Sequence, residues 1–186
     1  MTDYLPGGRR RVDRVLAPDF VAGLDGLDLD DIRARRAEAD QEETDLSYAR
    51  RLLQGRIDIL RAEQAARRGD GPMSGHPRTD EEIVKALSLV LADERRQDHG
   101  MGRHTVSEPS RIGEHRREAE RAVADVGGSA TDDMSDEALA AAVAKLVDVE
   151  ARVSRVRREV QGVVDALTAE IARRYAAGGV PVGTGS

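Results

Sequence analysis

Cysteine is absent from this chain of 186 residues, and tryptophan is absent as well. Without cysteine the chain can form neither a disulfide nor a thiolate metal site. Aromatic residues make up only 2% of the sequence, with a single phenylalanine, whereas 34% of the residues are charged. This balance argues against a thick globular core and favours an elongated helical protein.

Long apolar runs and an excess of positive charge are also missing. No stretch of the sequence is long and apolar enough to span a bilayer, and the first residues lack the pattern of a signal peptide. We therefore expect a cytoplasmic protein without a membrane association. The net charge of -6 makes direct DNA binding unexpected, because that affinity comes from clustered basic residues.

A gapless internal repeat is the most informative feature that is present. Residues 43–67 recur as residues 150–174, and the identical positions are mostly polar. They include the motif Glu-x3-Ser-x2-Arg-x3-Gln-x3-Asp in both copies. The motif residues are Glu43, Ser47, Arg50, Gln54 and Asp58 in the first copy, and Glu150, Ser154, Arg157, Gln161 and Asp165 in the second. A repeat that served packing alone would share its apolar residues first, so this one indicates a ligand that is contacted twice.

Helix-start and helix-stop patterns predict an all-α protein, an antiparallel two-helix coiled coil with shorter accessory helices and flexible loops. We expect residues 1–28 to form an N-terminal docking arm, residues 29–178 to form the helical domain, and residues 179–186 to form a flexible tail. Within the domain we expect long helices at about 30–68 and 136–177, an accessory helix at about 80–96, a loop at 97–112 and a short charged helix at 114–126.

Apolar residues spaced by seven define the expected seam of the coiled coil. The a positions are Ile32, Ala39, Leu46, Leu53 and Leu60 in the first long helix, and Leu139, Leu146, Val153, Val160 and Leu167 in the second. In this register each motif occupies e, b and f positions, a stripe about 80° wide and about 22 Å long beside the seam. If the helices pair antiparallel, a local twofold axis relates the two stripes, and a twofold-symmetric ligand would fit them.

The residue types of the motif suit guanine and phosphate. Arginine matches the O6 and N7 acceptors of guanine, and a carboxylate can accept from the N1 and N2 donors. Serine and glutamine add neutral donors for phosphate or ribose oxygens. Gly55 and Gly162 follow the two glutamines, although glycine inside a helix costs about 1 kcal/mol relative to alanine. Close approach of a ligand or of the neighbouring helix would explain both glycines.

The complete motif in both copies resembles the cyclic di-GMP signature of the actinobacterial RsiG anti-sigma factors. The resemblance implies that the ten motif residues bind a dimer of cyclic di-GMP on an antiparallel helical pair. It also implies that the loaded protein sequesters WhiG, a flagellar-type sigma factor that drives sporulation genes, as a monomer in a 1:1 complex. Candidate contacts with the sigma factor are the arm around Phe20 and the apolar helix with Leu87 and Leu91, although either could instead cover the coiled coil.

The glutamates and arginines of the motif also fit an alternative function, that of a coiled-coil adaptor protein that needs no nucleotide. In an adaptor of this kind they would form weak ion pairs, worth roughly 0 to 1 kcal/mol each when exposed. An enzyme is not expected, because Glu43 and Asp58 lie about 22 Å apart along the helix, too far for joint acid–base work on one bond. No metal site is predicted either, since the histidines at positions 76, 99, 104 and 115 fall in or beside loop-like segments. The sequence also contains no Gly-rich phosphate loop.

Overall fold

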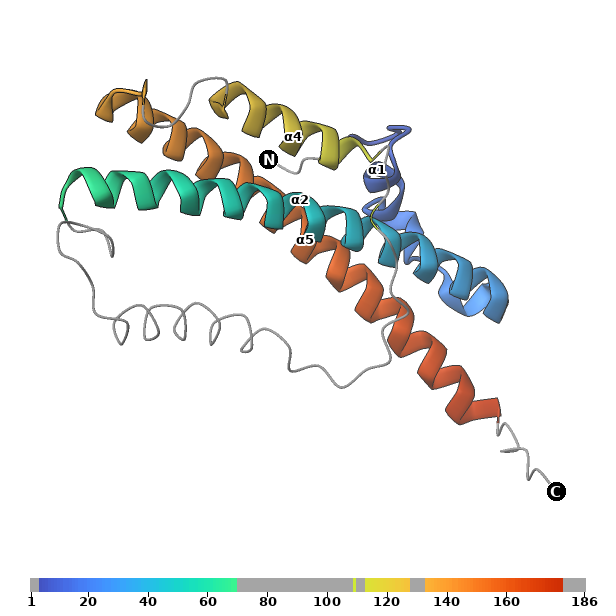
Figure 1. Cartoon of the computed structure of the whole chain (residues 1–186). Helices are drawn as coiled ribbons and strands as arrows, with labels where there is room; N and C mark the ends of the chain where they lie inside the picture. Colours follow the sequence, from blue (N-terminus) through green and yellow to red (C-terminus); the bar gives the residue numbers. More distant parts are fainter. Residues whose placement is uncertain (1–3, 70–108, 110–112, 128–132, 179–186) are drawn as a thin grey trace, which may run out of the picture.

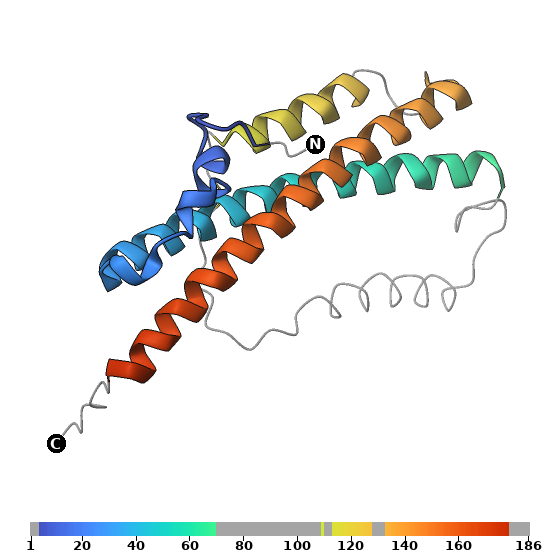
Figure 2. The same cartoon turned by 180° about the vertical axis from the view of Figure 1, so that it is seen from behind.

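Two long antiparallel helices form the frame of the molecule (Figures 1 and 2). The computed structural model describes residues 4–69, 109, 113–127 and 133–178. Helix α2 spans Leu29–Arg67 and helix α5 spans Asp136–Gly178, close to the bounds expected from the sequence. These described segments contain helices and no strand, which confirms the all-α coiled-coil prediction. The helix expected at about 80–96, with Leu87 and Leu91, the loop at 97–112 and the tail at 179–186 lie outside the described residues.

The seam between α2 and α5 is built from the heptad residues. In α2 every a position is fully buried, and in α5 no a position is more than 7% exposed. The d positions of α5 add Ala142, Val149 and Val156, which are also buried. The predicted register is therefore the observed one, and it turns the e and b positions to one flank of the seam and the g and c positions to the other.

Polar residues mark the ends of the long helices. The Asp28 carboxylate accepts a hydrogen bond of 2.7 Å from the backbone N–H of Asp31, and Ser135 does the same for Ala138 at 3.2 Å. These contacts satisfy N–H groups that have no partner inside the helix. At the other end of α2, Gly69 adopts a positive φ of 77°, the left-handed conformation in which helices often terminate.

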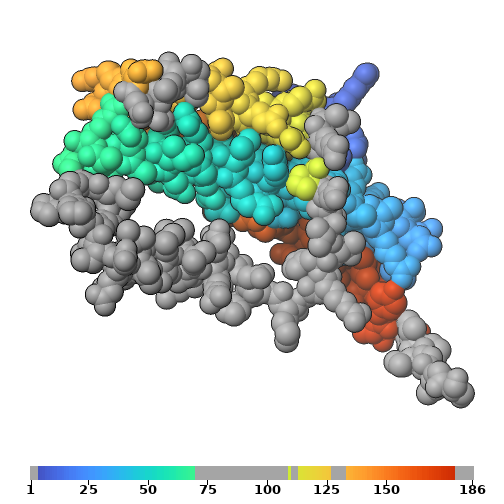
Figure 3. Space-filling model, in the orientation of Figure 1, coloured from blue at the N-terminus to red at the C-terminus, as the bar shows by residue number. Residues whose placement is uncertain are grey.

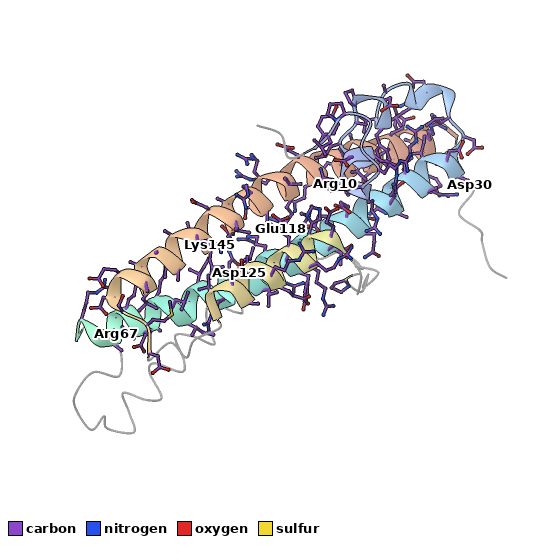
Figure 4. The ribbon with its side chains drawn as sticks, turned by 90° about the horizontal axis from the view of Figure 1, so that it is seen from above. Arg10, Asp30, Arg67, Glu118, Asp125 and Lys145 are labelled. Carbon is purple, nitrogen blue, oxygen red and sulfur yellow. The ribbon has the colours of Figure 1, made fainter. Side chains whose placement is uncertain are left out.

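A glutamate–arginine pair that is repeated outside the motif holds the segment that precedes each long helix. In α2 the Arg67 guanidinium bonds Glu63 at 2.6 Å, and it reaches the Met134 carbonyl oxygen and Asp136 where α5 begins (Figure 4). The counterparts in α5 are Glu170 and Arg174, and Arg174 donates to the carbonyl oxygens of Leu24 and Leu27 just before α2 begins. Each long helix thereby holds the segment that leads into the other.

Helix α4, Glu114–Gly127, packs along the g and c flank of the seam (Figures 1 and 3). His115 Nε2 lies 2.7 Å from a buried Glu42 oxygen of α2, and Lys145 of α5 bonds Asp125 at 3.2 Å (Figure 4). Ala119 and Val126 face inward and are buried. The short charged helix expected from the sequence is thus a third layer, held by ion pairs around a small apolar contact.

The N-terminal arm folds back onto the coiled coil. It contains helix α1, Arg11–Val15, and two 3-10 turns, Pro18–Phe20 and Leu24–Gly26. Val12 and Val15 are buried in the core, while Phe20 is half-buried against it with the Arg35 guanidinium 5.6 Å from its ring centroid. The arm thus covers part of the coiled coil, and its contact with a sigma factor stays a prediction.

One carboxylate organises the start of the arm. Asp13 is buried and accepts hydrogen bonds from the backbone N–H groups of Leu5 and Arg10 and from the Arg10 guanidinium. A Cβ on Gly8 would lie only 2.1 Å from an Asp13 oxygen, so this turn requires glycine. The Arg10 guanidinium lowers the pKa of Asp13 from its usual 3.8 to about 2.

We therefore predict that the arm detaches under acid conditions. A depressed folded-state pKa contributes stability that is fully present above about pH 4 and is lost as the pH falls toward 2. The protection factor of the Leu5 amide, which corrects for the pH dependence of intrinsic exchange, should fall across this pH range, and Asp13→Asn should lower the same protection factor at pH 7. The matched control is Asp19→Asn at an exposed position of the same arm. Equal protection in Asp13→Asn and the parent chain would contradict the prediction.

In the part of the chain that the structure describes, no helix has the length and apolar character needed to cross a membrane.

Candidate ligand-binding site

The motif residues lie on the flank of the α2–α5 seam that α4 does not cover. Helix α4 contacts α2 through Glu42 and Tyr48 and α5 through Lys145 and Arg152, all at d, g or c positions. The motif occupies e, b and f positions, which point the other way. We call this surface the motif flank.

A first cluster forms around Glu150. Its Oε1 atom accepts from Ser154 Oγ at 2.8 Å, from Arg50 Nε at 3.1 Å and from Gln54 Nε2 at 3.1 Å. The serine belongs to the same helix as the glutamate, whereas the arginine and glutamine come from the other long helix. We call these four residues the Glu150 cluster.

A second cluster repeats this arrangement around Glu43. Its Oε1 atom accepts from Ser47 Oγ at 2.8 Å, from Arg157 Nη1 at 2.9 Å and from Gln161 Nε2 at 3.3 Å. These four residues, the Glu43 cluster, match the Glu150 cluster with the roles of α2 and α5 exchanged. The expected local twofold relation between the two copies is therefore present in the hydrogen bonding.

Each cluster mixes the two copies of the motif. Antiparallel pairing brings the arginine and glutamine of one copy to the glutamate and serine of the other. Asp58 and Asp165 stay outside both clusters; both are exposed, and neither bonds another described residue. Sequence reasoning missed this exchange because it depends on how the two helices are staggered.

Each cluster retains unused hydrogen-bonding groups. Within the described residues, the Oε2 atoms of Glu43 and Glu150 accept no hydrogen bond, and Arg50 uses only its Nε. Arg157 uses Nη1, while its buried Nε has no partner there. A carboxylate oxygen and guanidinium N–H groups thus remain available side by side, although the Arg–Glu contact is already formed.

The ion pairs expected of an ordinary coiled coil are also present. Arg50 and Glu150 are 3.1 Å apart, Arg157 and Glu43 are 2.9 Å apart, and these four side chains are 20% to 35% exposed. The serines and glutamines take part in the same hydrogen bonds, so packing of the helix pair accounts for them too. It does not account for the repeated aspartates or glycines.

The glycines of the repeat face open space. A Cβ built on Gly55 or Gly162 meets no atom within 4 Å, and both residues are exposed. Close approach of the neighbouring helix is therefore not the reason for glycine at either position, because alanine would fit and would favour the helix. Both glycines also occupy c positions, on the opposite side of the seam from the e and b positions of the motif, so they do not line the motif flank.

Cavities and histidines lie away from the motif. A cavity of about 250 Å³ on the other flank is lined by arm and α4 residues together with Glu42 and Asp45, and a second of about 130 Å³ lies beside it. Neither contains a motif residue. His115 contacts Glu42, and no group of three metal-ligating side chains occurs among the described residues. The histidines at 76, 99 and 104 lie outside those residues.

A family model described as RsiG-like matches residues 18–91 and 125–185, which is more than half of the chain. Both copies of the motif fall inside these segments. No curated protein matches the chain.

Proposed function

Because the chain belongs to the RsiG-like family, a family of regulatory anti-sigma factors, we propose that it binds cyclic di-GMP and, when loaded, sequesters a flagellar-type sigma factor such as WhiG. The observation that carries the proposal is the pair of twofold-related clusters around Glu43 and Glu150. Two matching clusters on one surface suit a ligand that is itself twofold symmetric, as a dimer of cyclic di-GMP would be.

The unused groups of each cluster complement guanine. The free carboxylate oxygen can accept from guanine N1 and N2, and the free guanidinium N–H groups can donate to O6 and N7 or to a phosphate oxygen. The Arg–Glu contact can persist while the ligand binds, and it holds the arginine in place beforehand. Such preorganisation lowers the entropy that binding must otherwise lose.

The proposed link to the sigma factor follows from the position of the motif flank. The arm and α4 cover the other flank, so a nucleotide bound to the motif would become part of an exposed surface of the helix pair. A partner that contacts this surface would bind more tightly when the nucleotide is present. By linkage, the partner must then tighten the nucleotide by the same factor.

The direct test is a pull-down of the flagellar-type sigma factor by this protein, with cyclic di-GMP, with cyclic di-AMP and without nucleotide. We expect capture only with cyclic di-GMP, because the clusters match the hydrogen-bond pattern of guanine, whereas adenine would place its N1 acceptor against the carboxylate and its N6 donor against the guanidinium. Equal capture in all three samples would instead support a nucleotide-independent adaptor, in which the clusters serve only to join α2 and α5.

A further inference from the structure

The ten motif residues carry more negative than positive charge, although the proposed ligand is an anion. The carboxylates are Glu43, Asp58, Glu150 and Asp165, and only Arg50 and Arg157 oppose them. Both arginines already contact a glutamate. Each cyclic dinucleotide brings two phosphate charges, which these carboxylates would repel. Cations outside the motif must therefore complete the site.

The repeat contains a further pair of arginines in the right place. Arg51 and Arg158 follow the motif arginines directly and are identical in the two copies. Both are exposed, and each donates its Nε to a motif serine carbonyl, Arg51 to Ser47 at 3.4 Å and Arg158 to Ser154 at 3.2 Å. Both arginines occupy f positions, as Asp58 and Asp165 do, and therefore lie on the motif flank. Among the described residues, their Nη groups have no acceptor.

Each of these arginines lies in line with the motif aspartate of its own helix. Arg51 and Asp58 are seven residues apart, so both occupy f positions and lie about 10 Å apart along α2. The corresponding pair in α5 is Arg158 and Asp165. Each copy of the motif therefore has an additional cation on the edge of the motif flank where its aspartate lies.

We propose that Arg51 and Arg158 bind the phosphates of cyclic di-GMP. Adding these arginines balances the four carboxylates of the motif. Arginine suits the task because its planar fork can donate two parallel hydrogen bonds to a phosphate. Asp58 and Asp165 then lie about 10 Å along each helix from the bound phosphate, within reach of the N–H or hydroxyl donors of the same nucleotide. The inference deepens the proposed function and depends on it.

The test is calorimetric titration of the full chain with cyclic di-GMP, alone and mixed with the sigma factor. Loss of a charge-assisted contact at each arginine should make Arg51→Ala/Arg158→Ala bind about 100-fold more weakly. The matched control is Arg117→Ala/Arg121→Ala, which removes the same charge from exposed positions of α4 on the other flank and should bind normally. Arg51→Lys/Arg158→Lys keeps the charge and should recover part of the affinity.

A second measurement on the same variant separates ligand contact from folding. Arg51 and Arg158 are exposed, and each makes one hydrogen bond to its own helix, at 3.4 Å and 3.2 Å. The melting temperature and helical content of Arg51→Ala/Arg158→Ala should therefore match those of the parent chain. Parent affinity in this variant would overturn the inference and leave the proposed function standing. Absence of binding by the parent chain, both alone and with the sigma factor, would overturn both.

Discussion

Replacing Arg50 and Arg157 together with alanine is expected to abolish capture of the sigma factor in the presence of cyclic di-GMP. A hydrogen bond to a charged group contributes about 1.5 to 3 kcal/mol. Losing one such group from each cluster should therefore cost on the order of 3 to 6 kcal/mol of binding. Since about 1.4 kcal/mol corresponds to a tenfold change in affinity, the loss exceeds about 100-fold.

The same double variant should remain folded. The two Arg–Glu pairs are partly exposed, and exposed ion pairs stabilise proteins by about 1 kcal/mol or less. Circular dichroism should show unchanged helical content, which separates loss of the site from loss of the fold. Arg117→Ala/Arg121→Ala again serves as the charge-matched control. If both Arg50→Ala and Arg157→Ala retain full nucleotide-dependent capture, these arginines do not belong to the site.

Leu60→Ala is expected to destabilise the protein by about 2 to 5 kcal/mol. Leu60 is fully buried in the seam, so removing its side chain leaves a cavity between α2 and α5. Its neighbour Ile59 is a similar residue that is 55% exposed. Ile59→Ala should change the free energy of unfolding by no more than about 0.5 kcal/mol.

Chemical denaturation followed by circular dichroism measures both variants. The comparison tests the register of α2, because a shift by one residue would exchange the roles of Leu60 and Ile59. Equal destabilisation by the two substitutions would mean that α2 does not pack against α5 in the register described. Capture of the sigma factor with cyclic di-GMP should decrease in Leu60→Ala as the protein is destabilised, and it should remain normal in Ile59→Ala.

The helical frame could be predicted from the sequence because its determinants are local. Leucines and other apolar residues recur every seven positions, and this spacing alone places Leu46 and Leu53 on one face of a helix. The helix ends were also recognisable, because Ser135 and Gly69 are residues that favour a helix start and a helix stop. The motif residues could be assigned to the flank beside the seam on the same grounds.

The composition of the two clusters could not be predicted, because it depends on contacts between distant residues. Glu150 meets Arg50 of the other long helix because of how the two antiparallel helices are staggered. The buried turn around Asp13 was missed for a similar reason, since its partners are contacts of the folded arm. In contrast, Arg51 and Arg158 were visible in the sequence as identical residues of the repeat, and charge counting within the motif would have drawn attention to them.

The union of both motif helices in one chain has a consequence for how the site behaves at low protein concentration. A site assembled from two separate chains disappears on dilution below the dissociation constant of the dimer. Here α2 and α5 are tethered, so each sees the other at an effective concentration that dilution does not change. The two clusters should therefore remain assembled even when very few molecules are present, and the affinity of the site for the nucleotide should not depend on the concentration of the protein itself.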